Sequence, residues 1–178
     1  SAWSRPFKTP SKAPVGTYTR ICAALSKLSL LLAVIGLIAV ILCVQWQVFG
    51  RYVMNDTPTW AEALAMLLVL FVTAFGLAVG VRDAGHIGLE SMVALLPDRW
   101  RHRIEIVIHA LVGLFGALMA QGGWLWATAK WGEKKPMLPV PDGIDYVPLV
   151  IAGVLIVLFS IEHVIALIQG KVVEPAWN

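Results

Sequence analysis

Four long apolar stretches alternate with shorter polar stretches along the chain. They are residues 28–50, 63–81, 106–129 and 146–170. Only the last contains a charged residue, Glu162, with His163 beside it. A helix needs about 20 apolar residues to cross the roughly 30 Å hydrocarbon core of a bilayer, and each stretch has about that length. The pattern therefore predicts an all-α integral membrane protein with four transmembrane helices.

Composition agrees with a chain whose main solvent is lipid. Of its residues 58% are hydrophobic and 14% are charged, and the mean hydropathy is +0.77. The charges gather beside the apolar stretches, which excludes an ordinary soluble domain. The pI near 9.0 indicates no nucleic-acid partner, because the basic residues flank apolar stretches and form no separate patch. Cys22 and Cys43 lie before and inside the first stretch, so we expect structural thiols without a disulfide.

The distribution of basic residues predicts the orientation in the membrane. Residues 1–27 carry five Lys or Arg and no acid, which favours the cytoplasmic side. Alternation then places residues 82–105 inside, and 10 of the 14 basic residues become cytoplasmic. We therefore expect an N-in/C-in topology with a basic cytoplasmic segment (1–27), a transmembrane domain (28–170) and a cytoplasmic tail (171–178). The first stretch is too long for a signal peptide and lacks an A-x-A-like site, so we expect it to be retained.

The cytoplasmic loop between the second and third stretches carries an amphipathic pattern. Its apolar residues recur at spacings near three and four: Ile87, Leu89, Met92, Val93, Leu96, Trp100 and Ile104. This pattern predicts an amphipathic helix along the cytoplasmic membrane surface, in contact with lipid. Pro97 and Asp98 interrupt it, and a second helix is expected to begin at Asp98 as N-cap and to continue into the third span.

Small residues predict where helices pack closely. They are Gly76 and Gly80 in the second stretch, and Gly113, Gly116, Ala117 and Ala120 in the third. Small residues four apart allow helix backbones to approach each other in lipid.

The outer hairpin between the first two stretches contains four candidate site residues, Arg51, Tyr52, Trp60 and Glu62. Thr59 and Glu62 have the spacing of a capping box, in which the carboxylate accepts a hydrogen bond from the Thr59 N–H. Arg51 and Glu62 also have the charges for an ion pair that holds the hairpin or contacts another subunit. The two roles are compatible.

A second candidate motif lies where the second stretch leaves the membrane. Its members are Gly76, Arg82, Gly85 and His86. Glycine permits a sharp change of chain direction, and a histidine there is typically a surface or capping residue. For Arg82, a subunit-interface or structural role has the alternative that the side chain only extends toward lipid phosphates.

Polar groups inside the spans are few. Glu162 and His163 form a candidate interfacial polar pair. His109 and His163 also raise the alternative of a haem held between two helices, although we expect no cofactor and no metal site. The middles of the spans are apolar apart from isolated residues such as Thr73 and Gln121, so this chain is not expected to carry a translocation path alone.

The two motifs together resemble the small membrane subunit (DctQ-type) of tripartite ATP-independent periplasmic (TRAP) transporters. The resemblance rests on Arg51-Tyr52, Trp60-Ala61-Glu62, Gly76, Arg82 and Gly85-His86-Ile87, and is strongest from about Val48 to Leu96. One difference is Ala63, where the family often has a second acid.

The resemblance implies a non-enzymatic role in the bacterial inner membrane. The small subunit braces a large multi-span subunit that carries the substrate and sodium sites, and a soluble periplasmic protein delivers the substrate, typically an organic acid. The motif residues are then candidates for subunit contacts. Two alternatives remain at this point: a membrane-anchor subunit of a redox enzyme, and a free-standing small membrane protein.

Overall fold

The computed structural model describes residues 16–84, 97–170 and 173. The described chain is helical, and its elements follow in this order: α1 (Thr17–Phe49), η1 (Gly50–Met54), α2 (Thr59–Val79), η2 (Gly80–Ala84), α4 (Asp98–Ala129), η3 (Asp142–Tyr146) and α5 (Val147–Ile168). Gly85, His86, most of the basic segment and the expected amphipathic helix lie outside these residues, so their predicted roles stay predictions.

The four α-helices are all long and apolar enough to cross a membrane, which confirms the predicted fold class. Helix α1 begins well before the first apolar stretch, at Thr17. Helix α4 begins at Asp98 and continues without a break through the third span, as predicted. The N-cap position is Pro97, so Asp98 is the first residue of the helix rather than its cap.

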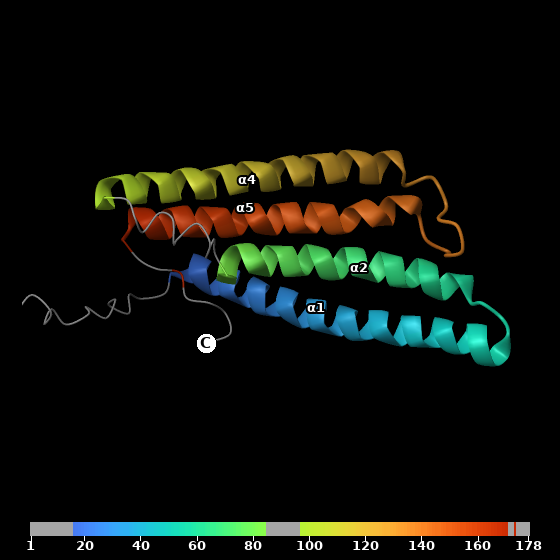
Figure 1. Ribbon diagram of the computed structural model, residues 1–178. Helices are drawn as coiled ribbons and strands as arrows, with labels where there is room; N and C mark the ends of the chain where they lie inside the picture. The colour runs from blue at the N-terminus through green and yellow to red at the C-terminus, as the bar shows by residue number, and fades with distance from the viewer. Residues whose placement is uncertain (1–15, 85–96, 171–172, 174–178) are drawn as a thin grey trace, which may run out of the picture.

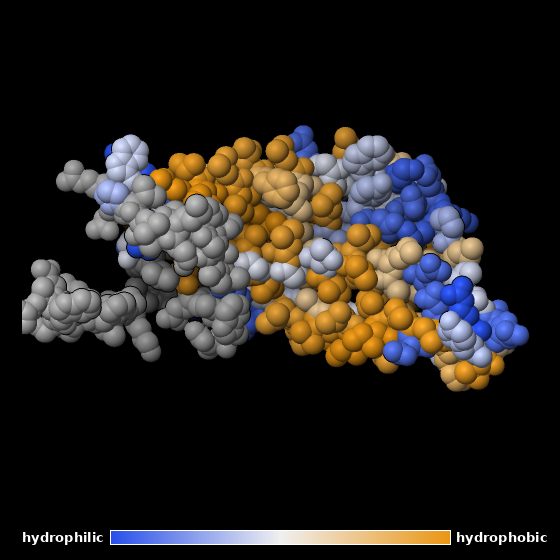
Figure 2. Space-filling model, viewed as in Figure 1, coloured by the Kyte–Doolittle hydropathy of each residue, from blue (hydrophilic) through white to orange (hydrophobic). Residues whose placement is uncertain are grey.

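The helices lie side by side in a row, in the order α4, α5, α2, α1 (Figure 1). Helices α2 and α5 are the inner pair. Of the most apolar part of each helix, 39% is buried in α5 and 28% in α2, against 11% in α1 and 6% in α4. The outer helices therefore expose most of their apolar surface, and hydrophobic residues cover the middle of the visible face while hydrophilic residues gather at one end (Figure 2). Such a surface is stable only against lipid or another membrane protein.

Close contact between α4 and α5 depends on glycines. A Cβ on Gly153 would lie 2.5 Å from the Gly116 carbonyl oxygen and 2.5 Å from the Ala120 nitrogen. A Cβ on Gly113 would approach the Ser160 Cβ to 3.2 Å. The prediction that small residues of the third span permit close packing is confirmed for Gly113, Gly116 and Ala120.

The matching prediction for the second span is not met by contacts within the described chain. A Cβ at Gly76 or Gly80 would meet nothing within 4 Å among the described residues. The buried small residues of α2 are Ala61, Ala65, Ala74 and Ala78, and the two nearest to Gly76 in sequence, Ala74 and Ala78, lie on a different face of the helix. Spacing alone did not indicate which face of α2 meets its neighbours.

Two π-helical turns end the first two spans, and both begin at a glycine. Turn η1 starts at Gly50, where a Cβ would lie 2.8 Å from Pro58 Cδ, and the chain then reverses at Asn55 with a positive φ of 55°. Turn η2 starts at Gly80 and carries Arg82 and Asp83. We refer to the two ends of the row by residues that mark them, as the Trp60 end and the Arg82 end.

Candidate functional site

Arg82 and Glu162 form a two-pronged ion pair inside the Arg82 end. Arg82 Nε donates to Glu162 Oε2 at 3.0 Å, and Nη2 donates to Oε1 at 3.1 Å. Both residues are 2% exposed. A planar guanidinium matches the geometry of a carboxylate, and paired hydrogen bonds of this kind are among the strongest polar contacts in proteins. The alternative that Arg82 only extends toward lipid phosphates is therefore wrong.

Asp83 and Ser26 extend this contact to the first helix. Arg82 Nη1 donates to Asp83 Oδ1 at 2.6 Å, and Ser26 Oγ donates to Asp83 Oδ2 at 2.7 Å. Ser26 is 0% exposed and Asp83 8%. The cluster of Ser26, Arg82, Asp83 and Glu162, here called the ionic cluster, thus joins α1, η2 and α5.

Local structure explains how η2 supplies two adjacent charged residues to one interior. A π-helical turn is wider than an α-helical turn, and such turns are frequent at functional sites. Arg82 lies beside the ring of Phe159, with its Cζ 6.0 Å from the ring centroid. Phe159 is fully buried and packs with Cys22, Ala78 and Leu155. This apolar surround excludes water and lowers the local dielectric.

The apolar surroundings of the ionic cluster determine how much free energy its charges cost and gain. Removing charges from water costs several kcal/mol per ion, and mutual attraction offsets this cost only when the hydrogen bonds are satisfied. Arg82 donates three hydrogen bonds from its guanidinium to Glu162 and Asp83, and each Glu162 oxygen accepts one of them. With all groups ionised the cluster has one positive and two negative charges. Losing one partner is therefore expected to be far more costly than losing a surface ion pair.

Two histidines connect the ionic cluster to α4. His163 Nε2 lies 3.0 Å from the Arg82 carbonyl oxygen, which can only accept, so Nε2 carries the proton of this hydrogen bond. The His163 ring stacks on His109 of α4 with centroids 4.5 Å apart and planes 5° apart. Glu162 and His163 are thus adjacent in sequence, and both contact Arg82. Parallel stacking at this distance leaves no space for a haem iron between the two ring nitrogens.

Contacts at the start of α1 complete the Arg82 end. Tyr18 donates its hydroxyl to the Leu158 carbonyl of α5 at 2.7 Å. Cys22 is 1% exposed and lies in the apolar cluster, while Cys43 is partly exposed farther along α1. The two thiols are free, as expected.

The candidate residues at the Trp60 end are not brought together in the same way. Arg51, Tyr52, Trp60 and Glu62 are all exposed. Glu62 accepts a long hydrogen bond of 3.5 Å from Gln47 Nε2, and the structure shows no ion pair between Glu62 and Arg51 within the described chain. Helix α2 begins without a side-chain cap, so the expected capping box is absent. These side chains remain accessible to a partner.

Sequence reasoning missed Ser26 and Asp83. A signal existed for Ser26, because Cys22, Ser26 and Ser29 recur at spacings of four and three and are the buried residues of α1. Asp83 is an acid directly after the arginine that was selected. Nothing in the sequence showed that both side chains point to one interior, since that depends on the π-helical turn.

The fold and this cluster define a multi-pass membrane protein of four packed helices without a polar path through its described middle. Residues 40–170 match the family model described as "Tripartite ATP-independent periplasmic transporters, DctQ component". The chain therefore belongs to the DctQ-component family of TRAP transporters. It is a transport component rather than an enzyme, and a multi-pass protein of the bacterial inner membrane.

Three curated relatives are also named as TRAP transporter permease proteins. The chain is 28% identical over 90 residues to the sialic acid TRAP transporter small permease protein SiaQ of Vibrio cholerae, which covers 49% of this chain and 52% of that protein. It is 27% identical over 104 residues to the C4-dicarboxylate TRAP transporter small permease protein DctQ of the same species, covering 56% and 44%. It is 30% identical over 66 residues to the sialic acid TRAP transporter permease protein SiaT of Haemophilus influenzae, covering 37% and 11%. The chain thus matches about half the length of the two small permease proteins.

Proposed function

We propose that this chain is the small scaffold subunit of a sodium-coupled, binding-protein-dependent TRAP secondary transporter that imports an organic acid, and that it braces the large transport subunit. The observation that carries this proposal is the ionic cluster. The charged groups described within the spans contact one another and hold helices together. Charged groups at a transport site must instead exchange partners as substrate or ion binds. A permanent role in packing fits a brace better than a transport site.

The relatives support the substrate class. The two small permease proteins are named for sialic acid and for C4-dicarboxylates, which are both organic acids. The choice between such acids belongs, in this proposal, to the large subunit and to a periplasmic substrate-binding protein, because the described spans of this chain offer no comparable polar site.

The SiaT relative supports a large membrane partner. The matched stretch is only 11% of that permease protein, so most of its length is additional permease sequence. We take this as an indication that a segment like this one works beside a much larger permease portion. The partner proposed for the present chain is a permease portion of this kind.

The exposed residues at the Trp60 end are the proposed subunit contacts. Arg51, Tyr52, Trp60 and Glu62 match the family motif and have no strong contact with the part of the chain that the structure describes. With the N-in/C-in topology this end faces the periplasm, where it is also accessible to the substrate-binding protein. Gly85 and His86 are proposed contacts on the opposite side of the membrane.

Co-purification tests the scaffold proposal. The chain is affinity-tagged and co-expressed with the large permease, and recovery of the large subunit is compared for wild type, Arg51→Ala and Glu62→Ala. Breaking a partly desolvated charge contact costs a few kcal/mol, so recovery is expected to fall at least about tenfold if the contact spans the subunits. Lys134→Ala, an exposed change in the other loop of the Trp60 end, is the control.

Sodium-driven uptake in proteoliposomes is the second readout. The scaffold proposal predicts that surviving complexes keep their sodium dependence. A complex that assembles normally but loses sodium dependence would place this chain in the transport site and contradict the proposal.

The stacked histidines argue against the redox-anchor alternative, because their rings leave no space for a haem between them. An absorption spectrum of the purified chain with haem supplied during expression tests this directly. A free-standing protein would be indicated by wild-type chain that recovers no large permease.

A further inference from the structure

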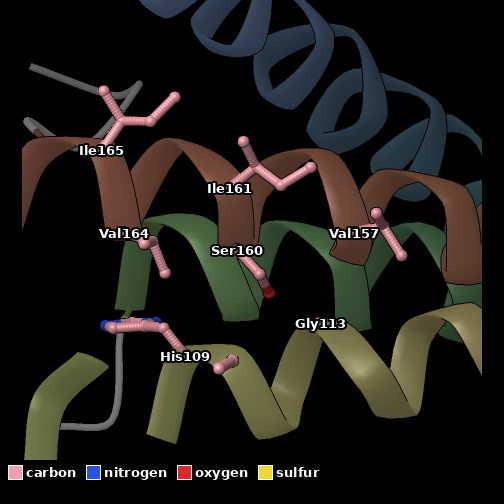
Figure 3. Close-up of a pocket in the computed structure, with 8 residues that line it drawn as sticks. His109, Gly113, Val157, Ser160, Ile161, Val164 and Ile165 are labelled. Atoms are coloured by element: carbon pink, nitrogen blue, oxygen red, sulfur yellow. The ribbon is translucent and has the colours of Figure 1, made fainter. Parts of the chain in front are cut away.

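A groove lies between α4 and α5 on one side of the row (Figure 3). Its volume is about 280 Å³, and its lining is almost entirely apolar. The residues that the argument uses are His109, Ala110 and Gly113 of α4 with Val157, Ser160 and Val164 of α5. A cavity of about 150 Å³ accepts a benzene molecule, so this groove has room for roughly two side chains.

Ser160 provides the evidence that the groove binds a partner and is not only a gap between two helices. The residue is 2% exposed, and its hydroxyl has no hydrogen-bond partner among the described residues. The Ser160 side chain points from α5 toward Gly113 of α4, where the missing Cβ leaves space for it (Figure 3). A buried hydroxyl without a partner costs free energy, and most buried hydroxyls in native proteins are paired.

The depth of Ser160 in the membrane limits which groups can form a hydrogen bond with its hydroxyl. Ser160 lies eight residues before the end of α5 at Ile168, which is about 12 Å along a helix axis. The surrounding groove is apolar and offers a water few polar partners. A lipid tail would fill the apolar part and leave the hydroxyl unsatisfied, since a hydrocarbon chain forms no hydrogen bond. A protein helix can supply apolar side chains and a hydrogen-bonding group together.

We propose that this groove is the docking site for one membrane-spanning helix of the large permease subunit, which inserts apolar side chains and hydrogen-bonds to Ser160 Oγ. The proposal rests on the scaffold function and adds to it the surface that the partner contacts. Ala110 and Gly113 lower the rim on the α4 side, so that a partner backbone can approach. The SiaT relative, in which the matched stretch is part of a longer permease chain, favours a permease helix over a second copy of this chain.

Photo-crosslinking in intact membranes tests which molecule occupies the groove. Benzoylphenylalanine replaces Ala110, an exposed residue at the groove, or Ala117, an exposed residue two turns farther along α4 that does not line it. The tagged chain is co-expressed with the large permease, irradiated, purified under denaturing conditions and analysed by mass spectrometry. Permease peptides attached several-fold more often at position 110 than at position 117 support the proposal. Lipid adducts, adducts between two copies of the chain, or equal yields at both positions overturn it.

Two substitutions test the contacts. Ala110→Phe fills the groove at an exposed position and is expected to lower recovery of the large permease at least about tenfold, whereas Ala117→Phe is expected to leave it nearly unchanged. Ser160→Ala removes only the hydroxyl and is expected to lower recovery about threefold, the size of one hydrogen bond between membrane helices. The isolated chain should melt at the wild-type temperature for the two phenylalanine variants and at an equal or higher temperature for Ser160→Ala, because an unpaired buried hydroxyl costs free energy.

The outcomes separate this inference from the scaffold proposal. If wild-type chain recovers no large permease, the scaffold proposal fails. If wild-type chain recovers it and neither Ala110→Phe nor Ser160→Ala changes the recovery, the complex exists and the groove is not its docking site.

Discussion

The guanidinium of Arg82 and the carboxylate of Glu162 meet through two hydrogen bonds of 3.0 and 3.1 Å, although 80 positions separate them in the sequence. One residue ends the second span and the other lies in the fourth. Their contact joins the two inner helices of the row, α2 and α5, at one end. The stability of the row therefore depends on a polar contact between surfaces that are otherwise apolar.

Removing one partner of this pair is expected to destabilise the chain strongly. Glu162→Ala leaves the buried Arg82 charge without its main partner, and we expect a loss of about 3–5 kcal/mol in the free energy of unfolding. The measurement is unfolding by denaturant in detergent micelles, followed by tryptophan fluorescence. Arg101→Ala breaks the exposed pair between Arg101 and Glu105 and serves as control, with an expected loss below about 0.5 kcal/mol. Similar losses for both variants would show that the buried pair is energetically ordinary.

Ser26→Ala is expected to loosen the attachment of α1. The hydroxyl donates to Asp83 at 2.7 Å, and losing a hydrogen bond to a charged group typically costs about 1.5–3 kcal/mol. Amide hydrogen exchange should increase near the start of α1 more than elsewhere. Ser29→Ala is the matched control, because Ser29 is also buried on α1 and forms no hydrogen bond with a charged group among the described residues. Equal exchange in both variants would contradict the role of Ser26.

Gly153→Ala is expected to separate α4 from α5. The added Cβ would lie 2.5 Å from backbone atoms of both Gly116 and Ala120, which cannot move aside without shifting the helix. Overpacking of this kind costs about 1–3 kcal/mol. Gly122→Ala is the control, since a Cβ there meets nothing within 4 Å among the residues that the structure describes, and alanine favours the helix. The melting temperature should fall for the first variant and stay equal or rise for the second.

Cysteine labelling tests the N-in/C-in topology. A cysteine at Asp142 is expected to react with a membrane-impermeant maleimide from the periplasm, and one at Arg101 only after the cytoplasm is opened. Cys22 and Cys43 are replaced by serine and alanine, respectively, to remove the native thiols. The reverse pattern of labelling would invert the proposed orientation.

The spans were predictable because each depends on its own residues. A continuous apolar stretch of about 20 residues specifies a membrane helix whatever its neighbours are, and the start of α4 at Asp98 followed from the preceding proline. The ionic cluster was not predictable in the same way. Pairing of Arg82 with Glu162 depends on how α2 and α5 are rotated about their axes, and the pattern of small residues gave the wrong face for Gly76. Arg82 and Glu162 were both selected, but separately, Arg82 where the second span leaves the membrane and Glu162 as the partner of His163.

The row arrangement also has a consequence for how the chain folds. Helix α1 packs on α2 and α4 packs on α5, so each pair consists of spans that follow one another in the sequence and can assemble early from local contacts. The joining of the two pairs is then the late, long-range step. Until it occurs, Glu162 lacks the guanidinium that stabilises it in the membrane. Because an unpaired carboxylate is costly inside a bilayer, the ion pair favours the correct association of the two hairpins over other arrangements.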